Sequence, residues 1–159
     1  MLLNPTTPNV ETQSREVQEA ARTLGVRLHI VHASSEGDFD AAFARMVQRK
    51  ADGLVIVPDP LFTTRSEQLA ALTLRHAVPA IFQFRKFVEA GGLISYGGSA
   101  AEVGHQGGLY TGRILKGEKP ADLPVQQITK IELIINLKTA KALGLTIPLT
   151  LYARAELIE

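Results

Sequence analysis

Gly53-Leu54-Val55-Ile56-Val57-Pro58-Asp59-Pro60 is the stretch that decides the fold. Four consecutive apolar residues, three of them β-branched, follow Gly53, which is typical of a strand buried on both faces of a parallel sheet. Pro58 ends the strand because it has no N–H to donate to a neighbouring strand. Asp59 then follows at the carboxyl end, where ligands bind in open α/β sheets. We therefore expect Asp59 to lie in a site.

Shorter apolar runs on both sides of this stretch alternate with segments of helical periodicity. We expect strands at 2–3, 26–31, 53–58, 78–82, 93–96 and 131–135, and helices near 10–24, 38–48, 64–74, 99–115 and 137–143. Single helices between successive strands predict right-handed βαβ units, and hence an α/β fold with three αβα layers and a parallel sheet. The commonest order of five such strands, 2-1-3-4-5, brings Asn4 at the end of the first strand opposite Asp59.

Local signals refine the ends of these elements. Thr64-x-x-Glu67 and Ser99-x-x-Glu102 have the spacing of capping boxes and should each open a helix. Phe84–Gly92 is expected to be a loop, and Pro148–Glu159 to contain one or two further helical turns.

Composition and charge exclude several classes of protein. The chain has 159 residues, enough for one domain, and 17 basic against 16 acidic side chains without any block of like charge. Neither nucleic acid nor a membrane surface is therefore expected as a partner. The absence of cysteine excludes disulfides and thiolate chemistry. No apolar run approaches the ~20 residues of a membrane span, and no signal peptide is visible.

Motifs of catalysis and of metal binding are missing from the sequence. Gly112–Gly117 has the glycine spacing of a Walker loop but continues with Glu118, and no Gly-x-Ser-x-Gly elbow is present. His29 and His32 are three apart on an expected strand, so they point to opposite faces and cannot share a metal. Gly97-Gly98-Ser99 fits either an anion-binding turn or an ordinary helix start. We expect no catalytic residues, no metal and no cofactor.

Polar and aromatic residues gather instead at the expected carboxyl ends of the strands. They are Asn4, Asn9, Asp59, Gln83, Arg85 and Tyr96. Asn and Asp at such positions either contact a ligand or only form turns and caps. Arg85 is either a clamp for a carboxylate or a solvated charge, and Tyr96 either stacks on a ligand or covers the sheet end. The set can form a binding site, but it contains no nucleophile and no acid–base pair.

Several segments resemble substrate-binding proteins of an ABC-transporter family. They are Leu3-Asn-Pro5, Val57–Leu61, Phe87–Gly97, Ile114–Pro124 and Glu132–Pro148, the last two being quite specific. The resemblance extends over essentially the whole chain. It implies one lobe of the type I periplasmic-binding-protein fold, and some members of the family bind aromatic amino acids such as tryptophan.

The resemblance also implies what lies outside this chain. Members have two α/β lobes that close on a ligand, and this chain is similar to the second lobe alone, so a first lobe and a signal peptide are expected upstream. It implies a non-catalytic, periplasmic or extracytoplasmic protein that takes up a small ligand, such as an amino acid, for a membrane permease. Asp59 would accept from a ligand amine or amide, and Arg85 or a helix N-terminus would hold a carboxylate.

The same resemblance implies that the chain leaves this lobe near Tyr96 and returns at Ile131. The helix Ser99–Leu115 would then carry an apolar face, made of Val103, Gly107, Tyr110 and Ile114, without a first lobe to cover it. Exposed apolar surface of this kind usually has a partner. We therefore expect the segment 99–120 to pack on the missing lobe or, through this helix, in a homodimer.

Two other functions remain open on the sequence. A single-domain flavodoxin-like enzyme or receiver would require an acidic Mg²⁺ pocket or a bound flavin. The effector-binding lobe of a transcription regulator would require a DNA-binding segment upstream.

Overall fold

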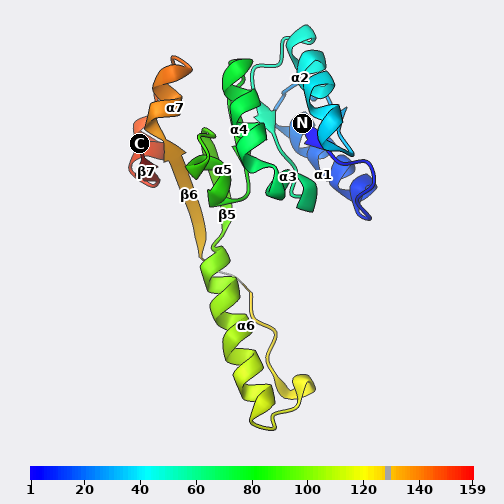
Figure 1. Cartoon of the computed structure of the whole chain (residues 1–159), viewed down its shortest axis with the longest axis vertical. Helices are drawn as coiled ribbons and strands as arrows, with labels where there is room; N and C mark the ends of the chain where they lie inside the picture. The colour runs from blue at the N-terminus through cyan, green and yellow to red at the C-terminus, as the bar shows by residue number, and fades with distance from the viewer. Residues whose placement is uncertain (128–129) are drawn as a thin grey trace.

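The computed structural model describes residues 1–127 and 130–159, and it forms a sheet flanked by helices from which one helix projects (Figure 1). The strands are β1 (Leu2–Leu3), β2 (Val31–His32), β3 (Leu54–Val55), β4 (Ala80–Phe82), β5 (Ile94–Gly98), β6 (Ile131–Asn136) and β7 (Glu156–Ile158). The α-helices are α1 (Val10–Thr23), α2 (Phe39–Gln48), α3 (Pro60–Thr64), α4 (Ser66–Arg75), α5 (Arg85–Glu89), α6 (Ala100–Leu115), α7 (Leu137–Ala142) and α8 (Leu149–Tyr152). Single 3₁₀ turns are η1 (Glu36–Asp38) and η2 (Pro120–Asp122).

The strand order confirms the predicted α/β architecture. Strands β3-β4-β5-β6-β7 form one hydrogen-bonded sheet, and β1 pairs with β2 in parallel. A parallel bridge between Leu2 and Ile56 joins the two sets. The order of the first five strands is therefore 2-1-3-4-5, with the 53–58 segment in the middle.

Strand β6 departs from the parallel arrangement because it runs antiparallel to β5, with Tyr96 opposite Leu133. The chain leaves the sheet at the end of β5, forms α6, and returns beside the point where it left. The backbone N–H of Ser99 donates to the carbonyl of Lys130 at 3.3 Å and closes the base of this excursion.

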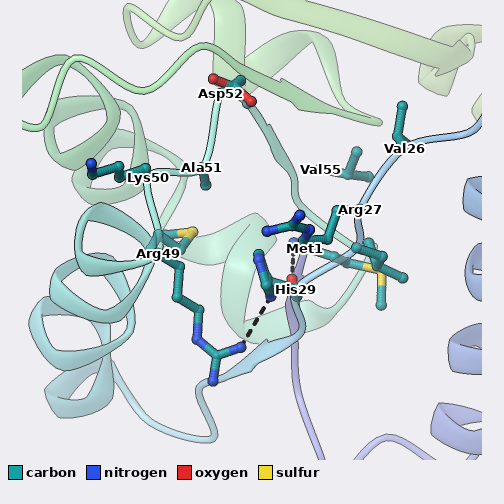
Figure 2. A pocket seen from close by; sticks show the side chains of 12 residues that line it. Met1, Val26, Arg27, His29, Arg49, Lys50, Ala51, Asp52 and Val55 are labelled. Atoms are coloured by element: carbon teal, nitrogen blue, oxygen red, sulfur yellow. Dashed lines mark hydrogen bonds between the residues drawn. The ribbon is translucent and has the colours of Figure 1, made fainter.

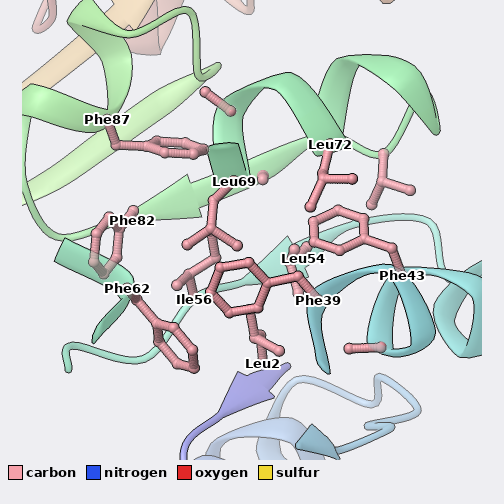
Figure 3. Packing of buried hydrophobic residues seen from close by; sticks show 14 of the residues in the cluster. Leu2, Phe39, Phe43, Leu54, Ile56, Phe62, Leu69, Leu72, Phe82 and Phe87 are labelled. Carbon is pink, nitrogen blue, oxygen red and sulfur yellow. The ribbon is translucent and has the colours of Figure 1, made fainter. Parts of the chain in front are cut away.

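Phenylalanine side chains fill the core between the sheet and its helices (Figure 3). The rings of Phe39 and Phe62 have centroids 6.0 Å apart, and Phe82 meets Phe87 edge-on at 5.8 Å. Each of these side chains is at most 1% exposed, which corresponds to about 1.5–3 kcal/mol of stabilisation apiece. The core is thus organised around the central strand, as its sequence predicts.

The prediction that the central strand is buried on both faces is wrong for one residue, Val55. Leu54 and Ile56 are 2% exposed, but Val55 between them is 47% exposed. Val55 lies at the edge of a cavity at the amino end of the sheet, which leaves its side uncovered.

The second strand is shorter than predicted. Residues 26–30 are not in a ladder, and β2 comprises only Val31 and His32. The reason is its partner: the N–H of Val31 donates to the Met1 carbonyl and that of Ala33 to the Leu3 carbonyl, so the ladder ends where β1 ends.

One predicted helix start, one predicted capping box and one predicted loop are also wrong. Thr64 does not cap a helix, because its hydroxyl donates back to the carbonyls of Pro60 and Leu61 in α3, and α4 begins two residues later. Ser99 precedes α6 as expected, but within the described residues its side chain makes no capping bond. The expected 84–92 loop contains α5, which forms because Phe87 and Val88 are fully buried.

The C-terminal segment contains both the expected turn and an unexpected strand. Helix α8 is the predicted helical turn, whereas β7 adds a parallel edge strand beside β6, with Leu157 opposite Ile135. At the preceding helix, Asn136 is the N-cap of α7, since its Oδ1 accepts from the N–H of Thr139 at 2.9 Å.

Helix α6 projects away from the rest of the molecule (Figure 1). All of its residues are exposed or half-buried. Of the helices formed by the described residues, none is both long and apolar enough to cross a membrane.

Candidate functional site

The carboxyl ends of β1 and β3 meet through the side chains of Asn4 and Asp59. The Asn4 amide Nδ2 donates to Asp59 Oδ2 at 3.2 Å, and both residues are 8% exposed. The predicted juxtaposition of these two residues across the middle of the sheet is therefore present.

Asp59 owes its position to the helix that follows it. Its Oδ1 accepts from the Leu61 N–H at 2.8 Å, so it is the N-cap of α3, with Pro60 in the first helical position. Its Oδ2 also accepts from the Thr7 hydroxyl at 2.8 Å. These bonds fix the carboxylate between the first and third strands.

The hydrogen-bonding capacity of the pair is not exhausted by these contacts. An ionised carboxylate has about four acceptor positions, and Asn4, Thr7 and Leu61 occupy three of them. The Asn4 Oδ1 accepts from the N–H and hydroxyl of Thr6, which leaves one N–H of its amide. Among the described residues, one acceptor position and one donor of the pair therefore have no partner at this end of the sheet.

A cavity of about 580 Å³ lies next along the same edge, between the end of β4 and the start of α6. Its size is in the range of small-molecule sites. It is lined by Thr63, Gln83, Phe84, Arg85, Lys86, Ser95, Gly97, Gly98, Ser99, Ala100, Ala101, Glu132 and Ile134. Two of the predicted site residues, Gln83 and Arg85, thus share one cavity.

Glycine at position 97 sets the shape of this cavity. A Cβ added to Gly97 would lie 2.5 Å from the carbonyl oxygen of Gln83 and 2.6 Å from its Cγ. Strands β4 and β5 can therefore carry Gln83 and Gly97 side by side only because residue 97 has no side chain.

The start of α6 forms one wall of the cavity and can offer hydrogen-bond donors there. Ser99, Ala100 and Ala101 line the wall, and the first N–H groups of a helix have no partner within the helix. A helix N-terminus also carries a partial positive charge. This wall suits a carboxylate, whereas Glu132 on the opposite strand suits an amine.

Arg85 lines the same cavity but is held by two acidic side chains. Its guanidinium forms two bonds with the Glu156 carboxylate, at 2.6 and 2.7 Å, and a third with Glu89 at 2.7 Å. Arg85 lowers the pKa of the Glu156 carboxyl by donating these hydrogen bonds to it. A ligand carboxylate would have to replace Glu156 to use the planar fork of Arg85.

Tyr96 and Asn9 lie apart from the cavity. Ser95 and Gly97 line it, while Tyr96 between them does not and is 55% exposed. Asn9 is exposed at the N-cap of α1, where its carbonyl accepts from the Gln13 N–H but its side chain makes no capping bond among the described residues. In the structure, Asn4 is hydrogen-bonded to Asp59, and Gln83 and Arg85 line the same cavity. Tyr96 and Asn9 belong to neither group.

A second cavity, of about 540 Å³, opens at the amino end of the sheet (Figure 2). The Met1 ammonium donates to the His29 carbonyl at 2.7 Å, and Arg49 Nη1 lies 3.1 Å from His29 Nδ1. Burial lowers the pKa of the Met1 amino group to about 6. None of the residues predicted for the site lines this cavity.

Sequence reasoning missed most of the lining of the first cavity. Thr63 could not be predicted as a lining residue because the sequence does not predict α3. Ser95 has the pattern of a buried strand residue. Gly97-Gly98-Ser99 does carry a signal, since a glycine pair before a helix start fits an anion-binding turn. Among the described residues there is no group of three metal-ligating side chains.

A family model and several solved structures match this chain over almost its whole length. The family model for ABC transporter substrate binding proteins matches residues 1–158. A conserved domain protein from Vibrio cholerae is 26% identical, with a TM-score of 0.87, and the match covers 99% of this chain and 53% of that one. No curated protein matches the chain.

Two further solved structures have the same fold. One is an ABC domain in complex with L-Trp from Streptococcus pneumoniae, at 25% identity and a TM-score of 0.86, with 99% of this chain and 53% of that one covered. The other is the ligand-free, open structure of a substrate binding protein with adhesive properties from Clostridium difficile, at 22% identity and a TM-score of 0.72, with coverage of 99% and 52%. The chain spans about half the length of the structures it matches.

Proposed function

This chain belongs to the ABC transporter substrate binding protein family, and on that basis we propose that it is a non-catalytic solute-binding lobe that captures a small molecule for a membrane permease. The observation that carries the proposal is the cavity at the carboxyl ends of β4 and β5, bounded by the N-terminus of α6. In open α/β sheets, ligands bind at this end of the strands.

An amino acid is the ligand class that we propose. The donors at the start of α6 suit a ligand carboxylate, and Glu132 or the free acceptor position of Asp59 suits its amine. Phe84 adds an aromatic surface for an apolar side chain. The pneumococcal neighbour that holds L-Trp supports an aromatic amino acid as the first candidate.

The two lobes of a binding protein close over the ligand, and this chain supplies one wall. We propose that the opposite wall comes from a separate lobe or a second copy, and that the protein acts outside the cytoplasmic membrane. The uncovered helix α6 supports such a partner, and we propose a homodimer through Ser99–Leu115. Binding by the isolated chain should be weak, because closure supplies water exclusion and the opposing contacts.

Titration with amino acids, followed by amide chemical shifts, tests the ligand class. L-Trp and the other aromatic amino acids should shift the amides of Gln83 and Ser99–Ala101, with millimolar or tighter affinity. The absence of a shift with every amino acid would refute the ligand class.

A variant of α6 tests the proposed carboxylate site. Ala100→Pro removes one N–H from the cavity wall, and proline is compatible with the first position of a helix that follows an extended Ser99 (φ −66°, ψ 115°). Ala100→Gly keeps the N–H and is the matched control. We expect weaker binding of amino acids to Ala100→Pro alone, by roughly tenfold. Equal loss in both variants would contradict the role of the N–H.

A further inference from the structure

Strands β5 and β6 run antiparallel up to the start of α6, and one face of this pair lines the cavity (Figure 1). In their register, Gly97 lies opposite Glu132 and Ser95 lies opposite Ile134. All four residues line the cavity, whereas the residues between them on each strand do not. Side chains alternate between the two faces of a strand, so the cavity is built on a single face of the pair.

The glycine at position 97 leaves space beside Glu132. Because its cross-strand partner has no side chain, Glu132 has none to pack against directly opposite. Its diagonal neighbours on the same face are Ser95 and the extended Ser99, two residues to either side of Gly97. Among the described residues, no hydrogen bond joins the Glu132 carboxylate to either serine, and all three side chains line the cavity.

The two serines are buried without a bonding partner in the described part of the chain. Ser95 is 2% exposed and Ser99 is 4% exposed. The Ser99 hydroxyl makes no capping bond to α6, and no hydrogen bond joins the Ser95 hydroxyl to a described residue. A buried hydroxyl that lacks a partner costs about 1–3 kcal/mol. A polar ligand group in the cavity would satisfy both.

Glu132 is the charged residue of the lining that is withdrawn from solvent. Arg85 and Lys86 are exposed, and Arg85 is already paired with two acidic side chains. The Glu132 side chain is only 26% exposed, and its ion pair with Lys130 is long, at 3.5 Å, to a side chain that is 68% exposed. Such a pair contributes little. A partly buried carboxylate is stabilised more by a cation that donates hydrogen bonds to it.

Glu132 suits a ligand amine better than Asp59 does. Asp59 does not line this cavity, and three donors already occupy its carboxylate, which has about four acceptor positions. Glu132 shares its cavity with the start of α6, the wall that suits a carboxylate. The amine and the carboxylate of an α-amino acid are bonded to the same carbon atom, so their partners have to lie in one cavity.

We propose that the Glu132 carboxylate and the hydroxyls of Ser95 and Ser99 form a site for a primary ammonium group. The site would select amino acids over carboxylates that lack an amine. This inference rests on the proposed function, because it concerns the same cavity. An ammonium group has three N–H donors and no acceptor, which matches one carboxylate and two hydroxyl oxygens.

A pair of ligands that differ in the amine tests this selection. L-Trp and indole-3-propionate have the same ring and a carboxylate, but the second has no amine. Titration of the whole chain, followed by amide chemical shifts, gives both dissociation constants. Wild-type protein should bind L-Trp more tightly than indole-3-propionate by roughly tenfold or more. Glu132→Gln keeps the shape of the side chain but removes its charge, and it should abolish most of this preference.

Two further variants separate recognition from general effects. Glu67→Gln removes the same charge from the exposed start of α4 and should keep the wild-type preference. Ser99→Ala should reduce the preference without lowering the urea midpoint, because its hydroxyl makes no capping bond among the described residues. A serine with a structural role alone would lower the midpoint and leave the preference unchanged, which would remove Ser99 from the site.

The outcomes distinguish this inference from the proposed function. If Glu132→Gln keeps the wild-type preference for L-Trp, the ammonium group is bound elsewhere, and the inference is overturned while the proposed function stands. If L-Trp does not bind to the wild type, tryptamine decides, because it has the ammonium group but no carboxylate. Shifts of the Ser95 and Glu132 amides with tryptamine, absent in Glu132→Gln, would support the ammonium site without the proposed ligand class. No shift with either amine would overturn both.

Discussion

The side-chain amide of Asn4 donates to the carboxylate of Asp59 at 3.2 Å, across 55 residues of sequence. The bond joins the ends of β1 and β3, which are neighbouring strands of the sheet. Both residues are buried, and the Thr7 hydroxyl adds a second bond to the same oxygen. The pair is therefore part of the framework as well as of the candidate site.

Replacement of Asp59 by alanine should lower the free energy of unfolding by about 2–3 kcal/mol, because α3 loses its cap and the buried Asn4 amide loses its acceptor. Urea denaturation measures this loss. Asp52→Ala, on an exposed residue, is the control and should change stability by less than about 0.5 kcal/mol. Equal effects of the two substitutions would contradict the framework role of Asp59.

Gly97→Ala should destabilise the protein by about 1–3 kcal/mol, because its Cβ would meet the Gln83 carbonyl at 2.5 Å. Gln83 would have to move to make room for this Cβ, and its displacement should change the amide chemical shifts along the cavity wall. Gly108→Ala is the matched control, since a Cβ there meets no atom of the described residues within 4 Å and alanine favours the helix. If Gly97→Ala is as stable as the wild type, the close approach of β4 and β5 is not a constraint.

Glu156→Gln should change stability at pH 7 by less than about 1 kcal/mol, because the ion pair with Arg85 is solvent-exposed. The pKa of Glu156 is lowered by this pair, so its small contribution is present above the ordinary carboxyl pKa and is lost as pH falls through the lowered value. Urea midpoints of the variant and the wild type should therefore converge as the pH falls below the ordinary carboxyl pKa. Glu16→Gln, on the exposed side of α1, should show no such convergence.

Glu156→Gln also tests whether Arg85 can reach a ligand carboxylate. Release of the two bonds from Glu156 leaves Arg85 with Glu89 alone. If Arg85 takes part in binding, the variant should bind an amino acid more tightly than the wild type. Unchanged affinity would leave the start of α6 as the carboxylate site.

In the isolated 159-residue chain, the amino group of Met1 should make stability depend on pH between about 6 and 8. Burial lowers its pKa from 8.0 to about 6 in the folded chain, so the unfolded state binds the proton more readily over this interval. Stability should rise as pH increases from 6 to 8, by at most about 3 kcal/mol, and the penalty should be complete below pH 6. Thermal unfolding of the 159-residue chain at several pH values measures the effect. Acetylation of the amino group should remove the pH dependence, and its persistence would contradict this origin.

The sheet could be predicted from sequence because its strands carry their own signal. The β-branched run at 54–57, the Gly25 and Gly144 helix stops and the Asn136 cap each encode a local conformation, and the structure contains them all. β7 could not be predicted in this way, because Glu156–Ile158 is too short for a pattern and forms only where β6 provides an edge.

The part of the candidate site that lies at strand ends can be predicted from the sequence. The part that depends on the positions of helices cannot. Asn4 and Asp59 follow from the strand order alone. The cavity depends instead on α3, α5 and the start of α6. The short helices α3 and α5 are held in place by the buried rings of Phe62 and Phe87, and these rings contact distant segments of the chain. The pairing of Arg85 with Glu156, over 71 residues, likewise has no local signal.

The hydrogen bond between the Ser99 N–H and the Lys130 carbonyl makes the segment between these two residues, which carries α6, an insertion whose ends touch. The two strands that it separates in sequence, β5 and β6, can pair only after a loop of some 30 residues has closed. The entropic cost of such a closure grows only logarithmically, by about 0.6 kcal/mol for each doubling of loop length. The sheet therefore tolerates a longer or shorter insertion at this point, so the insertion can vary in length while the lobe that carries it stays the same.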